Sequence, residues 1–129
     1  MIRSCTEYGS VVYHSLIPKY ISQKLESVQK QAMKIIYGWD LNYNKFVEDG
    51  RIETLEARRE TNVLKFAIKA SKSERFGQTW FQETPEIEHD LRPGIRPRYI
   101  ERLSKTERGR NNPLVYMTRK LNKHMSNQE

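Results

Sequence analysis

The sequence lacks the features of a secreted or membrane-spanning protein. Cys5 is the single cysteine among 129 residues, so no disulfide can form within the chain. No stretch approaches the roughly 18 consecutive apolar residues that a membrane helix requires. Glu7, Gly9 and His14 also interrupt any apolar segment of a signal peptide. We therefore expect a soluble intracellular protein, cytoplasmic or nuclear, without a membrane partner.

Residues typical of catalytic or metal sites are also scarce. The three histidines, at positions 14, 89 and 124, are too far apart to supply closely spaced metal ligands. The glycines are isolated from one another, so no glycine-rich loop is present to cradle a phosphate. No two of the three aspartates are adjacent in the sequence: Asp40, Asp49 and Asp90. We expect no catalytic residue, no metal site and no bound cofactor in this chain.

Charge and apolar residues are distributed unevenly along the chain. The formal net charge is +7, with 23 Lys and Arg against 16 Asp and Glu. Residues 1–89 carry 13 basic and 12 acidic side chains, whereas residues 90–129 carry 10 basic and 4 acidic. Residues 1–75 hold 32 apolar residues and residues 76–129 hold 15, too few for a core of their own. This contrast predicts a helical domain over residues 1–81 and a basic extension over residues 82–129.

Hydrophobic periodicity predicts three main helices in the first part. The first covers about residues 2–17 and is weakened by Gly9. The second runs from Pro18 to Tyr37 and ends at Gly38; its apolar stripe comprises Ile21, Leu25, Val28, Ala32, Ile35 and Ile36. The third follows Thr54 as N-cap and reaches about residue 73; its stripe comprises Leu55, Val63, Phe66, Ala67 and Ala70. A helical turn is expected over residues 43–49.

The C-terminal part is interrupted by prolines at positions 85, 93 and 97. A short helix is expected over residues 114–124, where Leu114, Met117 and Leu121 share one face. The predicted fold is therefore mainly α: a small bundle of about three helices with an irregular basic C-terminal extension.

Basic residues of the extension are the strongest binding candidates. Seven fall within 19 residues: Arg92, Arg96, Arg98, Arg102, Lys105, Arg108 and Arg110. Guanidinium groups match phosphate oxygens, and Tyr99 among them could stack on a base. Arg58, Arg59 and Lys65 of the third helix are weaker candidates for the same contact. For both groups the alternative is a basic surface that only interacts with water.

Several short motifs follow one another along the chain. Arg3, Glu7 and Tyr8 form an arginine-x-x-x-glutamate-tyrosine element, and an aromatic–histidine pair follows at positions 13 and 14. The second motif comprises Leu25, Glu26, Val28, Gln29, Ile36, Tyr37 and Gly38. The third comprises Thr54, Leu55, Glu56, Arg58 and Arg59. The last comprises Thr106, Arg108, Asn112, Pro113, Thr118, Arg119, Leu121 and Asn122. Together they resemble the downstream end of reverse transcriptases of non-LTR (LINE-type) retrotransposons.

The resemblance covers nearly the whole chain and implies a fragment of an RNA-directed DNA polymerase. It corresponds to the thumb and the extension that follow the palm. The palm aspartates, which hold two Mg²⁺ ions in the intact enzyme, are missing. Tyr13 stands where tryptophan is usual, Ala57 where glutamate is usual, and Met1 aligns with an internal position. We therefore expect a truncated copy with a natural C-terminus and without polymerase activity of its own.

The expected partners follow from the charge and from the resemblance. RNA, DNA or an RNA–DNA duplex would be held through its backbone, without sequence readout. The missing palm, or a second copy of the chain, would cover apolar helix faces that are left exposed. Two alternatives remain open: a stand-alone helical protein-interaction module, and a domesticated nucleic-acid-binding protein.

Overall fold

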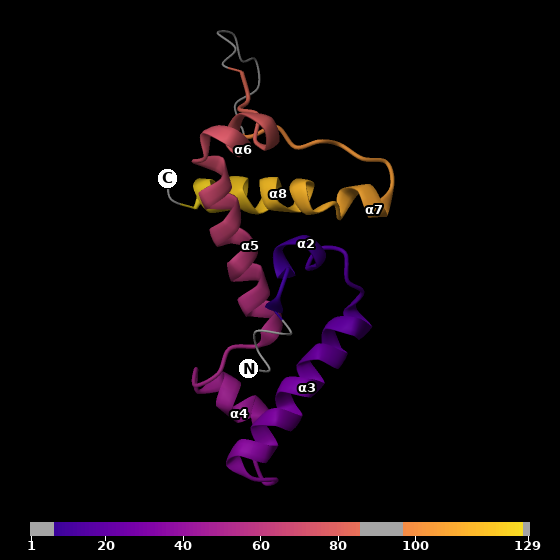
Figure 1. Cartoon of the computed structure of the whole chain (residues 1–129), viewed down its shortest axis with the longest axis vertical. Helices are drawn as coiled ribbons and strands as arrows, with labels where there is room; N and C mark the ends of the chain where they lie inside the picture. Colours follow the sequence, from indigo (N-terminus) through magenta and orange to yellow (C-terminus); the bar gives the residue numbers. More distant parts are fainter. Residues whose placement is uncertain (1–6, 86–96, 128–129) are drawn as a thin grey trace. The chain divides into compact units, whose positions relative to one another are not determined.

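A computed structural model describes residues 7–85 and 97–127. In these residues the fold is mainly helical, as predicted, with seven helices and no strand (Figure 1). The helices are α2 (Ser10–Tyr13), α3 (Lys19–Tyr37), α4 (Tyr43–Glu48), α5 (Leu55–Ser71), α6 (Glu74–Trp80), α7 (Glu107–Arg110) and α8 (Pro113–Ser126).

Residue contacts divide the chain into two compact units. Unit 1 comprises Met1–Val63 and unit 2 comprises Leu64–Glu129, so the division falls within α5. This grouping differs from the composition-based division after residue 81, which stays a prediction. Each unit is described separately below.

The core of unit 1 lies between α3, α4 and the segment that leads into α5. Met33, Tyr43 and Ile52 are buried together, and partly buried Leu41, Phe46 and Val47 pack against them. Figure 1 shows α4 beside the C-terminal part of α3. The short connection between them holds α4 close enough to share one core.

A polar network crosses the same region of unit 1. The Gln29 side-chain amide donates to the Tyr43 hydroxyl at 2.8 Å and to the Glu53 carbonyl at 3.2 Å. The Tyr43 hydroxyl in turn donates to the Glu26 carboxylate, which also accepts the backbone N–H of Leu55 at 3.0 Å. These bonds satisfy the amide donors of the buried Gln29, whereas its side-chain oxygen has no hydrogen-bond partner among the described residues.

The bounds of α3 confirm the expected helix, but its predicted buried stripe is partly wrong. Pro18 is the N-cap and Gly38 ends the helix with φ 102°, in the region that favours glycine. The buried residues are Gln29 and Met33, whereas Val28, Ile35 and Ile36 are exposed. Contact with α4 therefore decides which side chains of α3 are buried. The contacting face of α3 does not coincide with the face that carries the most apolar side chains.

The predicted N-terminal helix over residues 2–17 is wrong in its extent. Residues 1–6 lie outside the described part. In the remainder, Glu7 is helical and α2 covers Ser10–Tyr13, whereas residues 14–17 are not in a helix. Gly9 precedes α2 with φ 66°, which a continuous right-handed helix does not permit. The expected weak point at Gly9 is thus a break.

Unit 2 contains two helices that periodicity did not predict, α6 and α7. At α6 a Cβ on Gly77 would lie 2.6 Å from the Ser71 carbonyl oxygen, so the backbones pack too closely for a side chain. The helix expected over residues 114–124 is present as α8 and is slightly longer. The Asn112 side chain accepts the N–H of Leu114 and caps α8, and Pro113 occupies its first turn.

Candidate nucleic-acid interface

Residues 97–110 form a basic segment that is anchored at one end to the rest of unit 2. The backbone N–H of Thr84 donates to the Arg98 carbonyl and that of Ile100 to the Gln82 carbonyl, both at 2.9 Å. On α8, the Asn122 side-chain amide exchanges two hydrogen bonds with the backbone of Tyr99, again at 2.9 Å. The start of the basic segment is therefore fixed from two sides.

Tyr99 does not have the role that the sequence suggested. Its side chain is only 6% exposed, and its ring lies 5.8 Å from that of buried Phe81 in an edge-to-face arrangement. Stacking on a nucleic-acid base needs an open ring face, so that prediction is wrong in this structure. Tyr99 is a core residue that anchors the segment.

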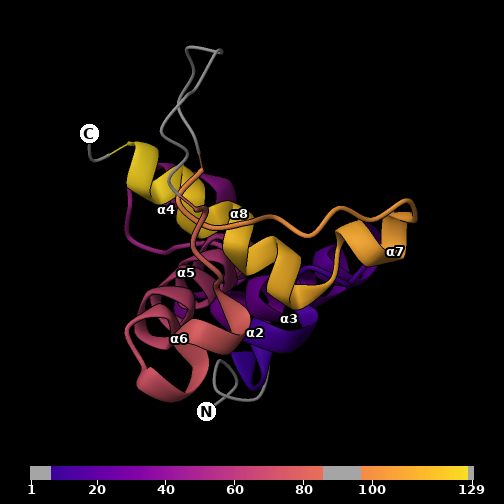
Figure 2. The same cartoon turned by 90° about the horizontal axis from the view of Figure 1, so that it is seen from above.

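The side chains that follow Tyr99 are mostly open to solvent. Arg102, Lys105, Arg108 and Arg110 are all exposed. The Thr106 hydroxyl accepts the N–H of Gly109 at 3.1 Å and caps α7, which contains Arg108 and Arg110. Figure 2 shows that α7 leads directly into α8. The structure thus presents four predicted cations from one short stretch of unit 2.

Arg98 is exposed but already engaged. Its guanidinium lies 3.3 Å from a Glu83 carboxylate oxygen and 5.8 Å from the centre of the Tyr99 ring. An exposed ion pair of this kind contributes about 0–1 kcal/mol, so a phosphate can compete for the arginine.

Cations of α8 add to the positive charge of unit 2. Burial lowers the pKa of Lys120, and the nearby charge of Lys123 lowers this pKa further. Lys120 also lies over the Tyr116 ring at 5.5 Å. The charges of these two lysines therefore repel each other, which adds to the effect of burial on Lys120.

The predicted arginines of α5 serve the structure of unit 1 instead. Arg59 is 0% exposed, and its guanidinium donates to the Ser22 hydroxyl at 2.7 Å. A phosphate cannot reach this side chain, so Arg59 is withdrawn from the candidate contacts. Arg58 forms an ion pair of 2.8 Å with Glu7, and its side chain is 30% exposed. Lys65 is exposed.

Two predicted residues are not placed by the structure. Arg92 and Arg96 lie outside the described residues, in the segment 86–96. The basic segment therefore retains Arg98, Arg102, Lys105, Arg108 and Arg110 as described candidates.

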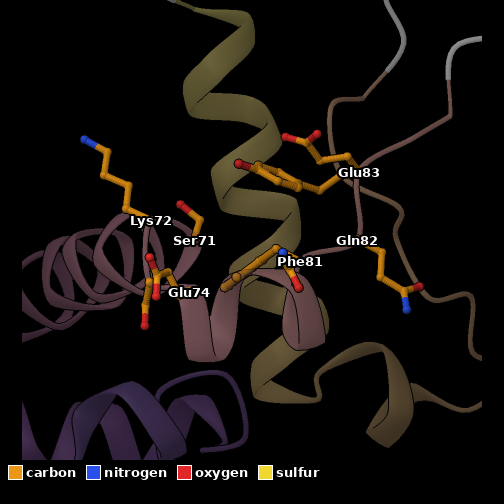
Figure 3. A pocket seen from close by; sticks show the side chains of 10 residues that line it. Ser71, Lys72, Glu74, Phe81, Gln82 and Glu83 are labelled. Carbon is orange, nitrogen blue, oxygen red and sulfur yellow. The ribbon is translucent and has the colours of Figure 1, made fainter.

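A surface pocket of about 520 Å³ lies beside the anchored end of the basic segment. Figure 3 shows Lys72 and Glu74 on one side of it and Gln82 and Glu83 on the other. Phe81 also lines the pocket. With two carboxylates and one ammonium group, the pocket is poorly suited to a phosphate, and we do not include it in the interface.

The described residues offer no ready metal site or membrane segment. Across 7–85 and 97–127, no group of three or more His, Cys, Asp or Glu side chains is placed to hold a metal ion. Over the same ranges, every helix is too short or too polar to cross a bilayer.

Comparisons with known proteins give no relative. No protein-family model, no curated protein and no solved structure matches the chain.

Proposed function

We propose that this chain binds nucleic acid through its sugar–phosphate backbone, as the thumb-like and downstream part of a retrotransposon RNA-directed DNA polymerase. The contacts are independent of base sequence, and the partner is RNA, DNA or an RNA–DNA duplex. In this proposal the chain contributes contacts to the nucleic-acid backbone, and metal-dependent nucleotidyl transfer belongs to a separate palm domain.

The single observation that carries the proposal is the exposed basic segment after Tyr99. Residues 97–110 contain five Lys and Arg against two Glu, and four of the cations are exposed beyond the anchored end. Arginine forks suit phosphate oxygens in two-point hydrogen bonding, and backbone contacts of this kind carry affinity without sequence readout. The ordered motifs that resemble retrotransposon reverse transcriptases support the same proposal.

The salt dependence of binding tests the proposal. We expect a fluorescently labelled RNA–DNA duplex to bind with an affinity that falls linearly with salt on logarithmic axes. Replacing Arg102 and Arg108 by alanine should reduce the slope by about 2, near 0.9 for each lost phosphate contact. Lys24→Ala/Lys45→Ala removes two exposed charges of unit 1 and is the matched control.

Two results would overturn the proposal. One is an unchanged slope for the Arg102/Arg108 variant. The other is binding to heparin as tight as to any nucleic acid, because this would reduce the interaction to net charge alone. Primer extension by the purified chain with Mg²⁺ would contradict the assignment of catalysis to another domain.

A second candidate function is a helical module that binds another protein. The exposed apolar side chains near the end of α3, Ile35, Ile36 and Tyr37, favour it. A stoichiometric complex that is lost on Val28→Asp or Ile36→Asp, in a chain without nucleic-acid affinity, would select this alternative.

A further inference from the structure

Unit 1 contains a second surface pocket, which is lined by residues of this unit alone. Its volume is about 520 Å³, and it is formed by the C-terminal half of α3 together with the turn into α4. Its lining includes Lys30, Lys34, Trp39, Asp40, Asn42 and Asn44. The pocket thus combines an indole ring, two ammonium groups and side-chain amides.

Trp39 is the most unusual member of this lining. Its side chain is 79% exposed, although an indole ring normally gains much free energy from burial. Gly38, with φ 102°, turns the chain at the end of α3, and the N–H of Leu41 returns to the Gly38 carbonyl at 3.3 Å. The turn holds the indole at the surface, where a flat apolar group can stack on it.

The two lysines supply charge beside that ring. Lys30 Nζ lies 5.1 Å from the centre of the Tyr43 ring, a cation–π distance. Tyr43 is buried, and its hydroxyl donates a hydrogen bond to Glu26, so the aromatic ring beneath Lys30 is held in place. Lys34 lies one turn further along α3 and is partly buried.

We propose that this pocket is a subsite for a nucleotide of single-stranded RNA or DNA. The base stacks on the Trp39 indole, and Lys30 and Lys34 hold neighbouring phosphates. An exposed aromatic ring beside cations is the combination with which proteins bind single strands without reading their sequence. An apolar partner alone would leave both lysines unused. This inference rests on the proposed nucleic-acid function and adds a contact that discriminates single strands from duplexes.

Asp40 sets a limit on the electrostatic contribution. Its carboxylate lines the same pocket and offsets one lysine charge. Stacking on Trp39 should therefore carry much of the affinity, and Asp40→Asn should tighten binding.

Tryptophan fluorescence provides a direct test, because the chain has only Trp39 and Trp80. In the Trp80→Phe variant of the full chain, oligo(dT) should quench the fluorescence of Trp39. The oligo(dT) concentration at half-maximal quenching should equal the midpoint of oligo(dT) binding measured by fluorescence anisotropy. An abasic oligomer of equal length should bind without quenching. An oligo(U) arm shows whether RNA binds in the same way.

Substitutions separate stacking from charge. Trp39→Ala should weaken oligo(dT) binding at least about five-fold, the lower end for one stacked base, and Trp39→Phe should retain most of the affinity. Lys30→Ala/Lys34→Ala should reduce the salt slope by about 1.4, from about 0.7 for each single-strand phosphate. Lys24→Ala/Lys45→Ala is again the matched control. Circular dichroism should show that each variant is folded.

The outcomes distinguish this inference from the function on which it rests. If oligonucleotides bind through Arg102 and Arg108 but neither quench Trp39 nor respond to Trp39→Ala, the subsite is refuted and the proposed function stands. If no nucleic acid binds, both fail. If Trp39 emission instead shifts with protein concentration, and Trp39→Ala abolishes self-association, the surface is an interface between copies and the subsite is refuted.

Discussion

The carboxylate of Glu26 accepts the backbone N–H of Leu55 at 3.0 Å, across 29 residues of sequence. Leu55 is the first residue of α5, where backbone N–H groups have no partner within the helix. A side chain of α3 thus caps α5 and places a negative charge at its positive end. The same carboxylate accepts the hydroxyl of Tyr43, so one group joins three helices of unit 1.

We expect Glu26→Ala to lower the free energy of unfolding of unit 1 by about 2–3 kcal/mol, because it leaves two donors without an acceptor. Tyr43→Phe removes one of these bonds and should cost about 1–2 kcal/mol. The double variant should lose less than the sum, since both changes break the same bond. Urea unfolding of the four proteins measures this coupling, and strict additivity would contradict the network. Exposed Gln23→Ala is the control.

Local capping of α5 was predictable from the sequence, whereas the long-range cap was not. Thr54 accepts the N–H of Ala57 at 3.2 Å, as its position before the apolar stripe predicted. Nothing in the local sequence connects Glu26 with Leu55, because their contact depends on how α3 and α5 pack. Buried Gln29 was missed for the same reason, since its hydrogen-bond partners come from other segments.

Two adjacent arginines show that the sequence alone does not predict which cations of the candidate site are exposed. Arg58 and Arg59 are chemically identical, and composition could only mark both as cations. In the structure Arg58 pairs with Glu7 at an intermediate exposure, whereas Arg59 is buried against Ser22. Arg102, Lys105, Arg108 and Arg110 are exposed, and few apolar residues surround them in the sequence. Periodicity finds helix faces, but only packing decides which charged side chains are covered.

The Asn122–Tyr99 contact provides a second stability prediction, in unit 2. Asn122→Ala would leave a buried N–H and a buried carbonyl of Tyr99 without partners. We expect a loss of about 2–4 kcal/mol in the free energy of unfolding, followed by the fluorescence of Trp80 in a Trp39→Phe background. Asn127→Ala, at an exposed position, is the control. A loss no larger than that of the control would show that Asn122 does not anchor the basic segment.

Tyr13 predicts how stability depends on pH. Burial raises the pKa of Tyr13 above 10, and the charge of Glu7 raises this pKa further, whereas that of Arg59 lowers it. A pKa that is higher in the folded state adds stability below pH 10, which is lost as the pH rises through the folded value. Stability above pH 10 should therefore fall less steeply in Tyr13→Phe than in the parent chain. Tyr20→Phe, at an exposed position, controls for the loss of one tyrosine. Equal slopes for the parent and Tyr13→Phe would contradict the raised pKa.

Substitution of Arg59 should lower the stability of the fold, whereas substitution of Arg108 should weaken the salt dependence of nucleic-acid binding. Arg59→Ala empties a fully buried site and removes the bond to Ser22, so we expect a loss of about 2–4 kcal/mol in the free energy of unfolding. Arg59→Met retains most of the volume and should cost less, and its folded fraction should bind nucleic acid with the parental salt slope. Arg108→Ala, at an exposed position, should leave stability unchanged and reduce the slope by about 0.9. Unfolding in urea and salt titration of binding measure the two quantities independently. If folded Arg59→Met has a reduced slope, Arg59 contacts the nucleic acid, and its buried position does not describe the bound state.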